Sequence, residues 1–207
     1  MLKDSKLYLI LDTQVADYGR LLTIARKAVG HGIDMVQLRD KKGLAKDILN
    51  FSYRLNRLLK NRIPYIINDR VDLALAAGAS GIHLGQEDLP IKTARRIFGK
   101  KMIIGASCQT LGQAQEAQRD GADYIGFGSV FKTLTKPYRR PMDLIQLAEV
   151  VRKIKIPVFA FGGIDNQNLS LVQKIGVRRV AVCRAICHVR DVAQAAMFFK
   201  ESLVQAS

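Results

Sequence analysis

Tyr124–Lys136 reads Y-I-G-F-G-S-V-F-K-T-L-T-K, an apolar, β-rich run that passes into a polar loop. Two glycines interrupt the run, and the loop carries Thr133, Thr135 and Lys136. An apolar strand that ends in a glycine-containing polar loop is how α/β proteins present functional groups at a strand's carboxyl end. Two hydroxyls and an ammonium so close together suit a phosphate or a diphosphate, although a solvated loop has the same residue types.

Segments of this kind alternate with helical patterns along the whole chain. Short apolar runs predict strands at 7–11, 35–38, 65–67, 81–84, 102–107, 123–127, 157–161 and 179–182. Apolar residues spaced three and four apart predict helices at 21–29, 44–59, 72–77, 90–98, 111–119, 144–154, 168–175 and 189–204. Eight strand-then-helix units predict an α/β fold, a closed and parallel (β/α)8 barrel rather than an open doubly wound sheet. We see no linker, so residues 1–207 are expected to form a single domain.

The size and hydropathy of the chain fit this fold. Its 207 residues, 48% of them apolar, suffice for one domain with a sizeable core. No stretch approaches the ~18 apolar residues of a membrane span, and the first apolar run is too short for a signal peptide. The three cysteines are an odd number, which argues against structural disulfides. We therefore expect a cytoplasmic protein with no membrane partner.

The chain is strongly basic, with 33 Lys and Arg residues against 18 Asp and Glu residues and a formal net charge of +15. The basic residues form short clusters spread along the chain, without a basic tail and with little aromatic interleaving. We interpret the charge as a solvated surface, or as a means of attracting phosphorylated metabolites. Nucleic acid is a less favoured partner, and a homo-oligomer is left open.

If the chain forms a barrel, its active site lies at the carboxyl ends of the strands. The opposite ends carry mainly Gly, Ala, Asp and Pro, whereas polar residues concentrate at the carboxyl ends. These are Asp12, Gln37, Arg39, Lys41, Asn68, Asp69, His83, Gln86, Asp88, Ser107, Gln109, Thr133, Thr135, Lys136, Gly162, Gly163 and Arg184.

Two acids on this rim, Asp69 and Asp88, follow strands that would be neighbours in a barrel. Two carboxylates on adjacent strand ends can hold Mg²⁺, which takes one or two carboxylates together with water and phosphate oxygens. The alternative is that each aspartate caps the helix that follows it. Opposite Arg39, Lys41 and Lys136, the pair would make a charge-balanced site for Mg²⁺ and a diphosphate, and we favour the metal.

Gly162 and Gly163 follow the seventh expected strand and precede a helix. Backbone N–H groups at this position bind a monophosphate in many such barrels. A plain turn that needs positive φ is the alternative. The site would then hold two phosphorylated groups, and it lacks an evident nucleophile such as a Ser-His-Asp set, a reactive cysteine or a Schiff-base lysine. These features predict displacement of a diphosphate that the protein stabilises as it leaves.

Six motifs, in this order, together resemble the thiamine-phosphate synthase family. They are Q-L-R-D-K (Gln37–Lys41), I-N-D-R (Ile67–Arg70), G-I-H-L-G-Q-E-D-L-P (Gly81–Pro90), I-I-G-A-S (Ile103–Ser107), D-Y-I-G-F-G-S-V-F-K-T-L-T-K (Asp123–Lys136) and F-G-G-I (Phe161–Ile164). The resemblance implies a (β/α)8 barrel that joins an aminopyrimidine methyl diphosphate to a thiazole ethyl phosphate, or its carboxylated form. The implied reaction uses Mg²⁺, releases pyrophosphate and passes through a pyrimidine methyl cation.

The resemblance also implies a role for each matching residue. Those expected to bind the pyrimidine diphosphate are Gln37, Arg39, Lys41 and Asn68, with Ser107 and Lys136 against its phosphates. Those expected to contact the thiazole phosphate are Thr133, Thr135, Gly162, Gly163, Cys183 and Arg184, the last three through their backbone. Asp69 and Asp88 would bind Mg²⁺, and the catalytic residues would be Arg39, Ser107 and Lys136.

The chain departs from the family pattern at Cys108 and Gln109, at Lys132, and at Arg184, where the family usually has serine. Arg184 could add a salt bridge to the thiazole phosphate or crowd its site. Three alternatives to a synthase stay open: a thiazole tautomerase of the same superfamily, a non-catalytic barrel that binds phosphorylated metabolites, and a nucleic-acid binder. The tautomerase branch tends to have histidine where Ser129 stands and to lose the T-x-T-K pattern, so the sequence favours the synthase.

Overall fold

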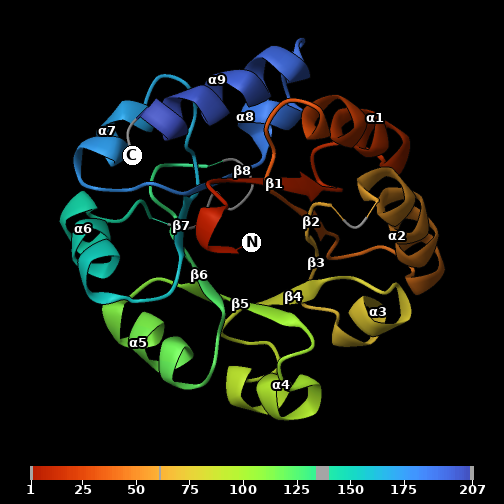
Figure 1. Cartoon of the computed structure of the whole chain (residues 1–207), viewed down its shortest axis with the longest axis horizontal. Helices are drawn as coiled ribbons and strands as arrows, with labels where there is room; N and C mark the ends of the chain where they lie inside the picture. The colour runs from red at the N-terminus through yellow and green to blue at the C-terminus, as the bar shows by residue number, and fades with distance from the viewer. Residues whose placement is uncertain (1, 61, 134–139, 206–207) are drawn as a thin grey trace.

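Eight parallel strands pair in chain order and close into a barrel, with β1 hydrogen-bonded to both β2 and β8 (Figure 1). The computed structural model describes residues 2–60, 62–133 and 140–205. The strands are β1 (Leu7–Asp12), β2 (Met35–Arg39), β3 (Tyr65–Asn68), β4 (Gly81–Leu84), β5 (Ile103–Cys108), β6 (Tyr124–Phe127), β7 (Val158–Phe161) and β8 (Val180–Val182). This confirms the predicted barrel, and every strand lies within one residue of its expected bounds.

The helices surround the barrel, one or more after each strand (Figure 1). They are α1 (Tyr18–Val29), α2 (Ala45–Leu59), α3 (Val71–Ala76), α4 (Ile91–Phe98), α5 (Leu111–Arg119), α6 (Leu144–Lys153), α7 (Leu169–Lys174), α8 (Arg184–Cys187) and α9 (Val192–Gln205), after a short 3-10 turn, η1 (Leu2–Asp4). The sequence did not predict α8, because a single helical turn is too short to display a period of three and four residues. The expected helix 189–204 begins at Val192 as α9.

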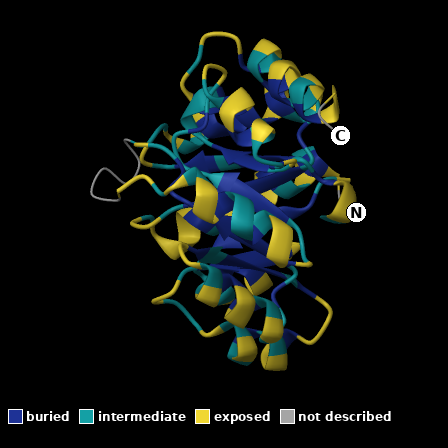
Figure 2. Ribbon diagram, turned by 90° about the vertical axis from the view of Figure 1, so that its left-hand side faces the viewer, coloured by how far each residue is buried: buried dark blue, intermediate teal, exposed yellow. Residues whose placement is uncertain are grey.

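The strands are buried because the helices cover the outside of the barrel and packed side chains fill its inside. The strands are buried on both faces, so they are nearly continuous apolar runs. Figure 2 shows this buried centre, with exposed residues on the outer faces of the helices. None of the described helices is long and apolar enough to cross a membrane.

The inside of the barrel is filled at its amino end by large side chains. A layer of buried residues packs there, with Leu2 of η1 against it; its members are Tyr8, Met35, Ile66, Tyr124, Phe159 and Ala181. In Figure 1 the N-terminal turn lies near the barrel axis. This layer fills the amino end of the barrel, so the space for a ligand lies at the carboxyl ends of the strands.

Candidate active site

A cavity of about 370 Å³ lies at the carboxyl ends of the strands. Its walls include side chains or backbone from nearly every strand end, so residues far apart in the sequence meet there. The residues expected to form the site that line it are Gln37, Arg39, Asn68, Ser107, Thr133, Gly162, Gly163, Cys183 and Arg184. Their roles toward a ligand remain predictions. Thr135 and Lys136 lie outside the described residues.

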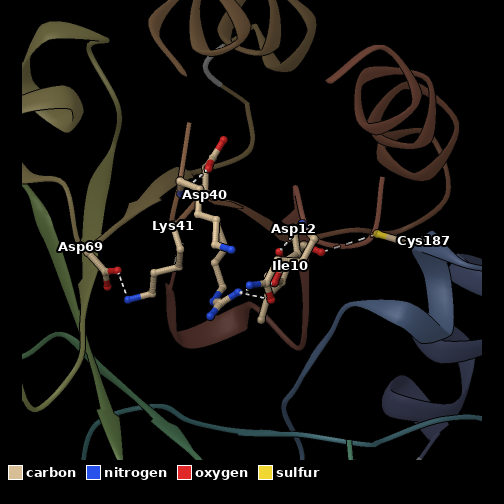
Figure 3. Close-up of polar contacts among 9 residues, drawn as sticks. Ile10, Asp12, Asp40, Lys41, Asp69 and Cys187 are labelled. Atoms are coloured by element: carbon tan, nitrogen blue, oxygen red, sulfur yellow. Dashed lines mark hydrogen bonds and ion pairs between the residues drawn. The ribbon is translucent and has the colours of Figure 1, made fainter. Parts of the chain in front are cut away.

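The two predicted metal ligands lie beside this cavity rather than in its wall. The carboxyl groups of Asp69 and Asp88 contact each other, and Lys41 forms an ion pair with Asp69. Figure 3 shows Lys41 and Asp69 extending toward one another from neighbouring strand ends, with Asp40 directed away from them. Lys41, Asp69 and Asp88 therefore form one charged cluster at the rim.

The alternative interpretation of the two aspartates as helix caps is wrong. The N-cap residues of α3 and α4 are Arg70 and Pro90, and neither helix has a side-chain cap. Asp88 instead accepts a hydrogen bond from the Gly85 amide at 2.7 Å. Asp69 has a φ of 62°, a left-handed conformation that is uncommon outside glycine. Neither carboxylate therefore caps the helix that follows it.

The proximity of these carboxylates moves their pKa values apart. Burial, and then the hydrogen bond with Asp88, raise the pKa of Asp69 above its ordinary value. Burial also opposes ionisation of Asp88, but hydrogen bonds from Asp69 and the Gly85 amide outweigh it and lower the pKa of Asp88. Two carboxyl groups in contact can share a proton, and a bound cation can replace that proton.

Arg39 is fixed by an acid that sequence reasoning placed on the rim without giving it a role. The guanidinium of Arg39 donates to Asp12 Oδ2 at 2.6 Å, and the Asp12 side chain is only 1% exposed. Gln14 Oε1 lies 3.3 Å from the same Arg39 nitrogen. The register of β1 and β2 pairs Asp12 with Arg39, so the ion pair follows directly from strand pairing. The sequence signal that could have identified this ion pair is an acid at the end of one strand and a basic residue at the end of the next strand.

The loop that carries Lys41 is also fixed. The Asp40 carboxylate accepts hydrogen bonds from the backbone amides of Lys42 and Gly43 at 2.9 and 2.7 Å, and from the Tyr18 hydroxyl at 2.5 Å. These bonds hold the turn after β2 against α1. They leave Lys41 free to reach across to Asp69.

The two glycines after β7 are required by both conformation and space. Gly162 and Gly163 have φ values of 96° and 67°. A Cβ on Gly162 would overlap the Ser129 hydroxyl, and one on Gly163 would lie 2.5 Å from the Lys132 carbonyl oxygen. The loop after β6 therefore packs directly on the loop after β7. Gly162 and Gly163 also line the cavity wall.

Sequence reasoning gave no role to the polar groups at the cavity floor. Tyr8, His83 and Tyr124 are buried there and hydrogen-bonded to one another and to Gln37 and Ser107. Tyr8 and Tyr124 lie in predicted strands that read as apolar, so their hydroxyls gave no separate signal. Only the closed barrel brings these strands, distant in sequence, face to face.

Comparison with known proteins relates the chain to one family. The family described as thiamine monophosphate synthase matches residues 7–186. The thiamine-phosphate synthase of Gloeobacter violaceus is 42% identical over 96% of this chain. The match covers 58% of the length of that relative. That of Ruminiclostridium cellulolyticum is 38% identical over 93% of this chain and 92% of its own length.

Solved structures agree with this relationship. Thiamine phosphate pyrophosphorylase from Pyrococcus furiosus is 36% identical, with a TM-score of 0.88 over 97% of this chain and 96% of its own. A 3-hexulose-6-phosphate synthase from Salmonella typhimurium has a TM-score of 0.76 over 98% of this chain and 100% of its own at 17% identity, and so shares the fold alone.

Proposed function

The chain belongs to the thiamine monophosphate synthase family, and we propose that its cavity is where thiamine phosphate is made. In this reaction an aminopyrimidine methyl diphosphate and a thiazole ethyl phosphate, or its carboxylated form, are joined and pyrophosphate is released. The observation that carries the proposal is the cavity at the carboxyl ends of the strands, because it collects the amide, cationic and glycine groups suited to both phosphorylated substrates. A cytoplasmic location and a homo-oligomeric state belong to the proposal as predictions only.

Asp69 and Asp88 are suited to Mg²⁺, since two adjacent carboxylates supply the hard oxygen ligands that this ion prefers. Among the residues that the structure describes, no cluster of three or more His, Cys, Asp and Glu side chains could hold a metal. Water and substrate phosphate oxygens would therefore complete the coordination, as is usual for Mg²⁺. When bound, the ion supplies positive charge that stabilises the departing diphosphate.

The chain's own residues would bind and orient the substrates. Arg39, held by Asp12, would bind diphosphate oxygens with Lys41, and Ser107 would donate a hydrogen bond to them. As the bond between the pyrimidine methylene carbon and oxygen breaks, its electron pair leaves with the diphosphate. The lone pair of the thiazole nitrogen then forms the new bond to that carbon. Positive groups aimed at the leaving oxygens lower the activation free energy of this displacement.

The remaining groups would hold the two rings and the monophosphate. The amides of Gln37 and Asn68 are buried polar groups that can orient the pyrimidine through hydrogen bonds. Gly162 and Gly163 line the cavity, and backbone N–H groups at this position of a barrel suit the thiazole phosphate. Thr135 and Lys136 keep the roles expected from the sequence.

The tautomerase alternative has less support. It would need a base where Ser129 stands, and the Ser129 hydroxyl is instead buried and donates to the Phe131 carbonyl at 2.9 Å. The test is to incubate the protein with both phosphorylated substrates and Mg²⁺ and to measure thiamine phosphate and pyrophosphate. Formation of both in equal amounts supports a synthase. Isomerised thiazole without thiamine phosphate would support the tautomerase, and binding of both ligands without product would support a non-catalytic barrel.

Arg184 provides a prediction about the thiazole phosphate. It lines the cavity with Gly163. None of the ion pairs among the described residues includes its guanidinium. A guanidinium free to pair with a phosphate contributes about 1.5–3 kcal/mol. We therefore expect Arg184→Ser to raise the KM for the thiazole phosphate about tenfold or more, with the KM for the pyrimidine diphosphate unchanged.

The matched control is Arg178→Ser, which removes an exposed arginine that precedes β8 at the other end of the barrel. Steady-state kinetics with each substrate varied in turn would measure both constants. A lower KM for the thiazole phosphate in Arg184→Ser would mean that Arg184 crowds the site.

A further inference from the structure

A row of hydrogen-bonded side chains crosses the floor of the cavity. Gln37 Nε2 lies 2.6 Å from the Tyr8 hydroxyl, and the Tyr8 hydroxyl lies 2.9 Å from that of Tyr124. The Tyr124 hydroxyl lies 3.0 Å from His83 Nδ1, and His83 Nε2 lies 2.8 Å from Ser107 Oγ. The row thus links Gln37, proposed to hold the pyrimidine, with Ser107, proposed to contact the diphosphate.

The middle of this row is buried and closely packed. Tyr8 and Tyr124 are 1% and 0% exposed, and their rings pack edge to face with Phe159 at centroid distances of 5.5 and 5.6 Å. Gly105 makes room for one of these rings, because a Cβ at this position would overlap the ring of Tyr124. Burial raises the pKa of both phenols far above the ordinary value, so each keeps a hydrogen to donate.

The hydrogens of the row can be counted. The Gln37 amide donates to the Tyr8 oxygen, so the Tyr8 hydrogen is available for Tyr124. The Tyr124 hydrogen then goes to His83 Nδ1, and the neutral imidazole carries its own hydrogen on Nε2 and donates it to Ser107 Oγ. The Ser107 hydrogen is left for a ligand. If the hydrogen between the tyrosines came from Tyr124, the Tyr8 hydrogen would have no acceptor in the row, which is costly for a buried hydroxyl.

We propose that Tyr8, Tyr124 and His83 are positioning residues that turn the Ser107 hydroxyl so that it donates to the diphosphate. The proposal rests on the proposed function, in which Ser107 faces anionic oxygens. Those oxygens favour the direction of donation that runs from Gln37 to Ser107. If the hydrogen bonds ran the other way, the Ser107 hydroxyl would donate to His83 and present its lone pairs to the diphosphate oxygens. The Gln37 amide sets the direction at one end and the diphosphate sets it at the other.

The role in the reaction is tested by a double-mutant cycle. We expect Ser107→Ala to lower kcat about 100-fold and Tyr124→Phe about tenfold. If Tyr124 acts through Ser107, adding Tyr124→Phe to Ser107→Ala should change kcat by less than about twofold. Losses that multiply to about 1000-fold would show that Tyr124 acts independently of Ser107 and would overturn the proposal.

Two further variants separate this role from a general effect on folding. Tyr65→Phe is the matched control, because Tyr65 is also a buried strand tyrosine, and its hydroxyl bonds Ser52 at 2.8 Å away from the cavity. It should leave kcat unchanged. If Tyr124→Phe folds poorly, the variant with both Tyr8→Phe and Tyr124→Phe replaces it in the double-mutant cycle. Because this variant removes both phenols, no buried phenol hydrogen is left without an acceptor.

The direction of the row can be measured without any substrate. Imidazole ¹⁵N–¹H NMR should show His83 protonated on Nε2 in the wild type. In Tyr124→Phe the Nδ1 resonance should shift, because Nδ1 loses the hydrogen bond from the Tyr124 hydroxyl. Since the chain has three histidines, His31→Gln and His188→Gln assign the signals. A wild-type His83 protonated on Nδ1 would overturn the proposal. If the wild type forms no thiamine phosphate, the proposed function fails, and the NMR result still decides the direction of the row.

Discussion

Asp69→Asn is expected to abolish most thiamine phosphate formation, with a loss in kcat of about 100-fold or more. The change keeps the size of the side chain and removes one of the two adjacent carboxylates proposed to hold Mg²⁺. Several kcal/mol of charge stabilisation for the leaving diphosphate would be lost with the ion, and each 1.4 kcal/mol corresponds to roughly a tenfold rate change. Initial rates measured across a Mg²⁺ titration would show both the loss in kcat and a higher Mg²⁺ requirement.

The control for this variant is Asp72→Asn, because Asp72 lies on α3 just beyond Asp69 and its side chain is 63% exposed. It should keep full activity and the same Mg²⁺ dependence. Asp69→Asn itself should fold normally, since an asparagine amide can donate a hydrogen bond to Asp88 and asparagine tolerates the left-handed backbone at this position. An Asp69→Asn protein with wild-type activity and unchanged Mg²⁺ dependence would remove Asp69 from the metal site.

Asp12→Ala is expected to lower the free energy of unfolding by about 3–5 kcal/mol. The change leaves the guanidinium of Arg39, whose side chain is 11% exposed, without the carboxylate that neutralises it. An unpaired buried charge is costly because it has lost its hydration without gaining a partner. Urea unfolding followed by circular dichroism would measure the loss, and activity should fall as well because Arg39 loses its orientation.

Two comparison variants separate the burial of this pair from the simple loss of an aspartate. Asp72→Ala breaks the exposed pair with Arg70, and we expect it to cost no more than about 1 kcal/mol. Replacing both Asp12 and Arg39 with apolar residues, as Asp12→Leu with Arg39→Met, should recover much of the stability while activity stays lost. Equal losses in Asp12→Ala and Asp72→Ala would mean that the Asp12–Arg39 pair is solvated in solution.

The order of strands and helices was the feature of the fold that could be predicted most directly from the sequence. A parallel strand covered on both faces must be apolar along its length, and glycine ends most of the helices, so each unit is marked locally. The single turn of α8 was missed because Arg184–Cys187 is too short to show a period. Its position matters, since it begins at Arg184, which lines the cavity.

The candidate site was predicted in part, as far as strand ends reveal it. Gln37, Asn68 and Ser107 could be assigned to one rim because parallel strands in a barrel all end at the same side. Whether Asp69 and Asp88 cap helices was a local question that the sequence left open. The structure decided against capping, since α3 and α4 begin at residues without a side-chain cap.

The sequence by itself thus determined the barrel, the family and the rim on which the polar residues gather, because these depend on local periodicity and on residue types at strand ends. Only the tertiary structure decided which groups meet: Asp12 with Arg39, Lys41 with Asp69, and Tyr8 with Tyr124. The last pair lies 116 residues apart in the chain. A hydroxyl inside an apolar strand shows its partner only when closure of the barrel brings the opposite strand within hydrogen-bonding distance.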